Sequence, residues 1–446
     1  MNAVQSTIAS LRTSKSLSRL PGSDGVDELW HLLRDPRAFF HDRFERYGRV
    51  FKSRLVVPCV FVVGEAANRT VLITRRAELS QGLGYARTAV KMVFENSLML
   101  QDGDDHQRMR GLLTPAVSRL SVRESAQRVH EIWRDALARA AQEPSADVYE
   151  LAERATFAVA ANALIGLELG PGTDAFRPHF ERLIAGVMAP VNVRVPFTAL
   201  DRALDARETL VSMLAEPIEA ARRRPPSGLV GQLAHHRNED GSQLPTDEIA
   251  HHLLLLAWAG YDTTASASSW VLHVLARRPD LQERLRRELE VLADDFSELD
   301  AHGAFPETEA FLLEIERMYP SALFFPRVTL ADVTIEGEVV PEGTLVFYTP
   351  YMSHRDPGSF RHPNAFDPSR WAPNAEPRLS PAKLFGFGGG PRVCLGKAFA
   401  RLQLKLMTRL LGGYDIEPEP TCRHKVLGLP VHHPTGSRVK LSKRPG

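Results

Sequence analysis

Residues 386–400, which read GFGGGPRVCLGKAFA, constrain the fold of this chain more than any other segment. A glycine-rich loop leads to Cys394, and the apolar spacing after it predicts a helix that continues to about Leu411. At a helix N-terminus, unpaired backbone N–H groups and the positive end of the dipole favour a thiolate, the form that binds a metal. The glycines would let a flat cofactor approach the backbone. Cys394 alone could equally be a buried small hydrophobe.

The residues around the cysteine decide between these two interpretations. Phe387, Gly390, Arg392, Cys394 and Gly396 match every fixed position of FxxGxRxCxG, the haem-binding signature of the cytochrome P450 superfamily. Chance would produce such a match with odds on the order of one in ten thousand. The resemblance implies that Cys394 is the axial thiolate ligand of a haem b iron. It also implies that Arg392 binds a haem propionate, that Phe387 shields the sulfur and that Gly396 belongs to the cofactor site.

A second feature is a long helix predicted from the start signal at residues 245–248 to Arg278, just before Pro279. Its middle, LLLLAWAG, is apolar all round, which predicts that the helix crosses the interior. The glycine that ends this stretch, Gly260, costs about 1 kcal/mol relative to alanine. The Thr263 hydroxyl can bond back to the carbonyl of Ala259 and loosen the helix.

The segment AGYDTT at residues 259–264 could be a tolerated glycine with polar neighbours. It also resembles the acid–alcohol motif of the P450 distal helix. That resemblance implies that Asp262 and Thr263 deliver protons to bound oxygen.

Further motifs follow in the order typical of the family. Glu314 and Arg317 stand three apart and share one helix face. This spacing alone is weak, because about one such match is expected by chance. The resemblance implies a buried network of both residues with Arg370 that holds the haem loop.

Three other residues match positions where the family binds the propionates, namely His106, Arg110 and Arg327. Arginine suits a carboxylate because its fork donates two parallel hydrogen bonds. Each of these residues could also be an ordinary surface cation.

The remaining pattern predicts a mainly α fold with small β-sheets, the cytochrome P450 fold. Residues 49–63 resemble two strands of a hairpin, and residues 328–348 form a second β region. We find no linker, repeat or low-complexity block. We therefore expect one domain over residues 1–446, with residues 1–25 as a flexible N-terminus.

Charge and cysteine content exclude several classes of protein. Lys and Arg (55) balance Asp and Glu (54), so nothing indicates a nucleic-acid partner. The N-terminus lacks an apolar stretch that could anchor it in a membrane. Three scattered cysteines argue against a disulfide framework and fit a cytoplasmic protein.

The resemblance implies a monooxygenase that inserts one oxygen atom of O2 into an apolar small molecule, by hydroxylation or epoxidation. We expect a separate electron donor, a ferredoxin or flavodoxin with its reductase, because only about fifty residues follow Cys394. Lys397 and Arg401 are candidate contacts for it. Family placement puts substrate-pocket walls at residues 79–100, 183–188, 255–263, 321–325 and 430–432.

Several segments, among them residues 386–406, resemble the retinoic-acid-hydroxylase branch. This favours an isoprenoid substrate such as a retinoid or terpenoid, with a macrolide or sterol still open. Two other functions remain. A peroxygenase would use H2O2 and would not need Asp262 and Thr263. A non-catalytic haem-binding or sensor protein would leave its ligand unchanged when supplied with reductant and O2.

Overall fold

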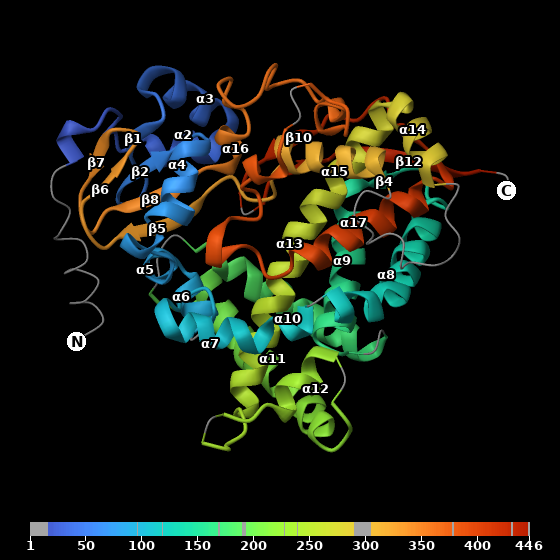
Figure 1. Ribbon diagram of the computed structural model, residues 1–446. Helices are drawn as coiled ribbons and strands as arrows, with labels where there is room; N and C mark the ends of the chain where they lie inside the picture. The colour runs from blue at the N-terminus through green and yellow to red at the C-terminus, as the bar shows by residue number, and fades with distance from the viewer. Residues whose placement is uncertain are drawn as a thin grey trace.

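The computed structural model describes residues 17–95, 97–117, 119–167, 170–189, 193–226, 228–238, 240–289, 305–376, 379–429 and 431–444. Helices dominate it, as expected (Figure 1). The helices are α2 (Glu28–Arg34), α3 (Pro36–Tyr47), α4 (Glu65–Arg69), α5 (Gln81–Ala86), α6 (Val90–Val93), α7 (Gly103–Leu113), α8 (Arg119–Ala140), α9 (Val148–Val159), α10 (Pro171–Val187), α11 (Ala199–Arg222), α12 (Gly228–His235), α13 (Thr246–Arg277), α14 (Pro279–Leu289), α15 (Pro306–Met318), α16 (Pro350–Ser353) and α17 (Lys397–Leu411).

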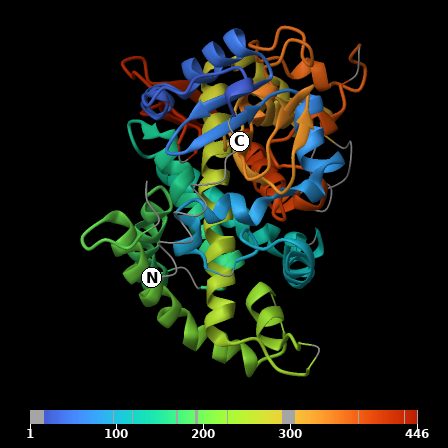
Figure 2. The ribbon, with the colours of Figure 1, turned by 90° about the vertical axis from the view of Figure 1, so that its left-hand side faces the viewer.

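Helix α13 is the long helix that the sequence predicts, and it crosses the molecule from end to end in Figure 2. Asp247 and Glu248 lie in its first turn, where carboxylates favour the positive end of the dipole. Most of its residues between Ile249 and Ala276 are buried. The prediction of a helix through the interior is therefore confirmed.

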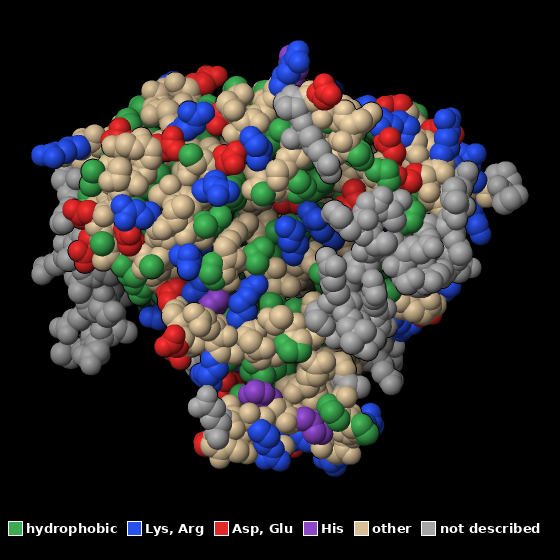
Figure 3. Space-filling model, in the orientation of Figure 1, with side chains coloured by type: hydrophobic (Ala, Val, Ile, Leu, Met, Phe, Trp, Pro, Cys, Tyr) green, Lys and Arg blue, Asp and Glu red, His purple; other side chains and the backbone are tan. Residues whose placement is uncertain are grey.

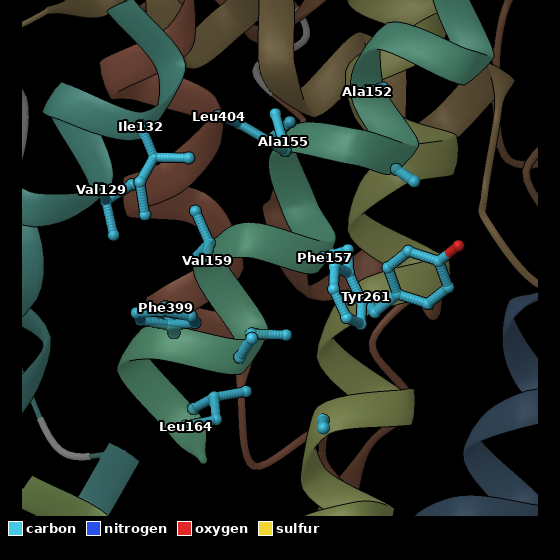
Figure 4. Close-up of a cluster of buried hydrophobic side chains, with 14 of the residues drawn as sticks. Val129, Ile132, Ala152, Ala155, Phe157, Val159, Leu164, Tyr261, Phe399 and Leu404 are labelled. Atoms are coloured by element: carbon cyan, nitrogen blue, oxygen red, sulfur yellow. The ribbon is translucent and has the colours of Figure 1, made fainter. Parts of the chain in front are cut away.

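The main core forms where α8, α9 and α17 pack around α13. Figure 4 shows Val129 and Val159 on α8 and α9 facing Phe399 of α17, with Tyr261 of α13 beside Phe157. The cluster includes residues from Ala89 to Leu441, so segments far apart in the sequence share it. This packing fixes α13 and α17, which carry two of the predicted motifs.

A five-stranded sheet covers one side of the helices, at the upper left of Figure 1. Its strand order is β1 (Val50–Arg54), β2 (Pro58–Val62), β8 (Leu345–Tyr348), β5 (Phe325–Thr329) and β3 (Leu79–Ser80). β1 and β2 pair antiparallel, with Phe51 opposite Phe61, which confirms the predicted hairpin. β2 then pairs parallel with β8, and this joins the two predicted β regions in one sheet.

Part of the N-terminal segment lies against this sheet. Leu17 and Leu20 are buried, and the N–H of Lys52 donates to the carbonyl of Pro21 at 2.8 Å. Of the segment that we expected to be flexible, residues 17–23 are therefore packed. Residues 1–16 lie outside the described residues.

Three smaller sheets complete the fold. They are β4 (Ala146–Asp147) with β12 (Arg438–Lys443) and β9 (Tyr414–Pro418), β10 (Lys425–Leu427) with β11 (His433–Thr435), and β6 (Val333–Ile335) with β7 (Glu338–Val340). Among the helices of the described ranges, none is both long and apolar enough to span a bilayer.

Candidate active site

A cavity of about 1380 Å³ lies between α13 and the loop that carries Cys394. All five segments predicted as pocket walls contribute to it, through residues such as Val90, Met188, Leu255, Phe324 and Val431. Pro430, named in the last of these segments, lies outside the described residues. Most of the lining is apolar, which suits an apolar ligand.

Of the four side chains at the cavity mouth, the sequence indicated only Leu83, which lies in the predicted segment 79–100. Leu33 of α2 and Val56 of the β1–β2 turn line the cavity, and so do Leu83 and Val193. Each of these four side chains is at least half exposed to solvent. The cavity therefore opens to solvent beside the five-stranded sheet, between these apolar side chains.

The cysteine loop is shaped by packing against its neighbours. The N–H of Cys394 donates to the carbonyl of Phe387 at 2.8 Å. Gly390 has a φ of +60°, and a Cβ there would lie 2.4 Å from the carbonyl oxygen of Leu72 in the π-helical turn η2 (Thr70–Thr74). Gly390 therefore makes room for Leu72, and room for a cofactor at the other glycines stays a prediction. Gly396 has open space around its Cα.

The Cys394 side chain is open to the cavity just before α17. Burial raises the pKa of its thiol, although the N–H of Gly396 and the charges of Arg110 and Lys397 lower it. The helix-terminal N–H and these two cations therefore favour the thiolate, in the direction that the sequence predicts, while burial opposes it. A metal ion bound to the sulfur would supply the missing positive charge.

Cationic side chains meet on one rim of the cavity. Arg392 donates to Asp102 at 2.5 Å and to the carbonyl of Gln101 at 2.6 Å, while its Nη1 is buried without a partner. Arg110 donates to the carbonyl of Val393 at 2.8 Å. Burial and the charges of Arg392 and Arg110 lower the pKa of His106 to about 4. Burial lowers that of Arg392 to about 10. These groups form an anion site whose positive charge is only partly balanced.

Arg327 lies behind this rim. Its guanidinium is 5.2 Å from the centre of the Tyr348 ring, and its Nη1 donates to the carbonyl of Pro326. Tyr348 lines the cavity, whereas Arg327 is buried and is not part of the cavity wall. Its charge still acts on the rim, because it contributes to the lowered pKa of Arg392.

On helix α13, the predicted bond between the Thr263 hydroxyl and the carbonyl of Ala259 is confirmed at 2.7 Å. The Ser321 hydroxyl also donates to the carbonyl of Thr263 at 2.7 Å, so two hydroxyl groups bond to carbonyls of this helix turn. Thr263 and Asp262 both line the cavity. Their side chains do not bond to each other. Asp262 Oδ1 instead accepts from the Tyr149 hydroxyl of α9 at 2.9 Å.

Asp262 has a shifted pKa with three identifiable causes. Burial raises the pKa of its carboxyl to about 6, the Tyr149 hydrogen bond lowers it and the charge of Glu153 raises it. Tyr149 is itself stacked on His433, with ring centres 3.7 Å apart, and Glu153 accepts from the Tyr261 hydroxyl. Asp262 can therefore gain and lose a proton close to neutral pH.

Replacing Tyr149 by phenylalanine should raise the pKa of Asp262 further above about 6. The lost hydroxyl stabilises only the ionised carboxylate, so its removal favours the protonated form. Infrared titration of the buried carboxyl band would measure the shift, with Asp262→Asn to assign the band. An unchanged or lower pKa would contradict the role of this hydrogen bond.

The predicted network of Glu314 and Arg317 is buried beneath the cysteine loop. Arg317 donates to both carboxylate oxygens of Glu314, at 2.8 and 2.7 Å, and Arg370 donates to Glu314 at 3.1 Å. The structure adds Trp371, whose Nε1–H donates to Glu314 Oε2 at 2.8 Å. These bonds confirm the predicted buried network of Glu314, Arg317 and Arg370, while its role in holding the loop stays a prediction.

His354 links this network to the loop, although no sequence motif indicated this residue. Its Nδ1 lies 3.2 Å from the carbonyl of Arg317, and its Nε2 accepts from the N–H of Phe385 at 2.8 Å. Both bonds require a neutral ring with the proton on Nδ1. Burial lowers the pKa of His354 to about 3, which keeps this form at neutral pH.

The two candidate docking residues lie beside the loop. Lys397 and Arg401 sit over the Phe387 ring, at 5.5 and 5.9 Å from its centre. Arg401 also pairs with Glu316 at 3.2 Å, which offsets part of its charge. Figure 3 shows Lys and Arg side chains in blue around a hollow near the centre of one face.

The donor set matches a haem. A planar group with one metal and two carboxylates needs a soft axial ligand and cations on one edge. Cys394 offers the sulfur, and the rim around the unpartnered Nη1 of Arg392 offers the cations. Ala259 and Gly260 of α13, whose side chains are small, line the same cavity.

Comparisons with known proteins agree with this arrangement. The family model described as Cytochrome P450 matches residues 29–435. Cytochrome P450 120 of Synechocystis sp. is 30% identical over 97% of this chain and 99% of its own length. An abscisic acid 8'-hydroxylase of Solanum lycopersicum is 28% identical over 88% of this chain and 84% of its own. A solved structure described as retinoic acid bound cyanobacterial CYP120A1 has a TM-score of 0.84 at 28% identity, over 95% of this chain and 99% of that one.

Proposed function

Because this chain belongs to the cytochrome P450 family, we propose that it oxidises an isoprenoid such as a retinoid or terpenoid. As a family member it is a haem-dependent monooxygenase that acts on an apolar small molecule with O2 and electrons from a redox partner. The proposed substrate class rests on the apolar cavity and on relatives named for abscisic acid and retinoic acid. The observation that carries the proposal is that Cys394 and Thr263 line the same, mostly apolar cavity.

We propose that the cofactor is haem b, held by Cys394 at the iron. His106, Arg110 and Arg392 would bind its propionates, and Arg327 would act from behind Tyr348. Phe387 would flank the sulfur, and Gly396 would leave the approach to it open. When bound, a thiolate-ligated haem supplies the cleavage of the O–O bond.

The residues of α13 handle protons on the other wall. The Thr263 hydroxyl donates its own hydrogen to Ala259, so its lone pairs remain free to accept from a donor in the cavity. The Asp262 carboxyl, with a pKa of about 6, can exchange protons with the interior around Tyr149 and Glu153. A water molecule or a rotation of the Asp262 side chain must connect the two, because they do not bond directly.

The electron donor that we propose is a ferredoxin or flavodoxin with its reductase. Lys397 and Arg401 are its candidate contacts, with Arg401 already partly neutralised by Glu316. We propose a cytoplasmic location, which the free thiols of Cys59 and Cys422 support.

The first experiment is the carbon monoxide difference spectrum of the reduced protein, followed by turnover of retinoids and terpenoids under labelled O2. A strongly red-shifted Soret band and one labelled oxygen atom in the product would support the proposal. Turnover with H2O2 alone would favour a peroxygenase. Bound but unconsumed ligand would favour a sensor.

Replacing Thr263 by alanine should lower the product formed per electron by about tenfold or more, because the hydroxyl that accepts from the proton donor is lost. Thr263→Ser keeps the hydroxyl and should retain most of the coupling. Comparison of electron consumption with product yield measures the effect. Equal coupling in the alanine variant would remove Thr263 from proton delivery.

A further inference from the structure

One cation in the cavity wall lacks a carboxylate partner and lies away from the cofactor rim. Six lysine and arginine side chains line the cavity within the described residues: Arg87, Lys91, Arg110, Arg392, Arg401 and Lys405. Three of these six are paired with carboxylates, Arg392 with Asp102, Arg401 with Glu316, and Lys405 with Glu309. Arg110 belongs to the rim beside Cys394. Two cations remain to be explained.

Arg87 and Lys91 differ in their surroundings. Lys91 is exposed, so water solvates its charge. Arg87, at the C-terminal end of α5, is partly buried, and its Nη2 donates to the carbonyl of Gly343 at 3.1 Å. Burial lowers the pKa of Arg87, and no acidic group offsets this effect. Its guanidinium therefore carries a poorly solvated charge with donors to spare.

The position of Arg87 is separate from the proposed propionate site. The Gly343 carbonyl to which Arg87 bonds lies in the turn before β8, where the Gly343 N–H donates to the carbonyl of Thr329. Arg110 and Arg392 bond instead to the carbonyls of Val393 and Gln101. Leu345 also pairs with Cys59, next to the turn with Val56 at the cavity mouth. The Gly343 carbonyl therefore places Arg87 toward this mouth, on a contact that Arg110 and Arg392 do not share.

We propose that Arg87 binds the carboxylate of an elongated apolar acid whose other end reaches the wall between Thr263 and Cys394. This inference rests on the proposed function and narrows its substrate to acids with an apolar chain or ring system. Arginine suits this task because it donates two parallel bonds to a carboxylate. The apolar cavity walls then hold the rest of the molecule.

Calorimetric binding to the haem-loaded protein tests the inference with two matched pairs of probes. They are all-trans-retinoic acid and its methyl ester, and hexadecanoic acid and its methyl ester. The acids should bind the unmodified protein more tightly than the esters. Arg87→Gln should weaken acid binding by about 10- to 100-fold and change ester binding by less than about threefold. Arg87→Lys should retain part of the preference.

Lys91→Gln is the matched control, because it removes a cation four residues away in the same wall. It should leave acid binding within about threefold of the unmodified protein. Equal affinity of the unmodified protein for acid and ester would overturn the inference without any variant. So would an unchanged preference in Arg87→Gln, or a loss confined to Lys91→Gln. In those cases, oxidation of an ester would show that the proposed function still stands. If no probe binds a protein with the thiolate spectrum, the acid class is wrong.

Discussion

Replacing Cys394 by serine should abolish the strongly red-shifted Soret band of the reduced, carbon monoxide-bound protein. Serine keeps the size of the side chain but replaces a thiolate, which donates electron density strongly, with a neutral hydroxyl. Burial already disfavours a negative charge at this position, and it raises the pKa of the thiol even though Gly396, Arg110 and Lys397 lower it. A serine hydroxyl would therefore stay protonated. Haem content and product formation should fall together with the band.

Cys422→Ser is the matched control, because it makes the same substitution at a partly buried thiol outside the cavity. The Cys422 thiol contacts the carbonyl of Gly436, near β11 and β12. The red-shifted band should survive this substitution unchanged. A band that persists in Cys394→Ser, or that disappears in Cys422→Ser, would refute the ligand assignment and the interpretation of the cavity.

The parts of this protein that sequence could predict are those set by neighbours in the chain. The start and length of α13, the β1–β2 hairpin and the pairing of Glu314 with Arg317 all depend on residues a few positions apart. The bond from Thr263 to Ala259 belongs to the same class, because it spans one helical turn. Local periodicity and spacing carry this information.

Contacts between distant segments could not be predicted in this way. Tyr149 is 113 residues from Asp262, and Asp102 is 290 residues from Arg392. Each contact depends on how helices pack, and many other polar residues could have taken the same place. The mouth of the cavity at Val56 arises likewise, from the parallel pairing of β2 with β8.

At several predicted positions the structure adds a second physical effect that the sequence does not contain. The helix terminus favours a thiolate at Cys394, while burial, which depends on distant segments, raises the pKa of the thiol. Gly390 fits a cofactor loop by pattern, yet its φ and the nearby carbonyl of Leu72 account for it. Arg327 occupies the position that the motif order predicts, but it lies behind Tyr348 and does not line the cavity.

Replacing Glu314 by glutamine should lower the free energy of unfolding by about 3–5 kcal/mol, because it leaves a buried arginine without its counter-charge. Glu314 and Arg317 are both 0% exposed, so water cannot solvate the orphaned charge. The carboxylate also accepts from the Asp367 N–H and from Trp371. A glutamine amide would turn its own N–H donors toward these donors.

The loss should reach the cysteine loop, because Arg317 and Phe385 both bond to His354. We therefore expect weaker haem retention as well as a lower denaturation midpoint, measured by urea unfolding of the haem-loaded protein. Glu181→Gln is the control, since it breaks the exposed pair with Arg177 and should cost within about 0.5 kcal/mol. Equal losses of unfolding free energy in the two variants would mean that burial does not determine how much the Glu314 network stabilises the protein. A destabilised Glu314→Gln protein with normal haem retention would instead separate the network from the loop.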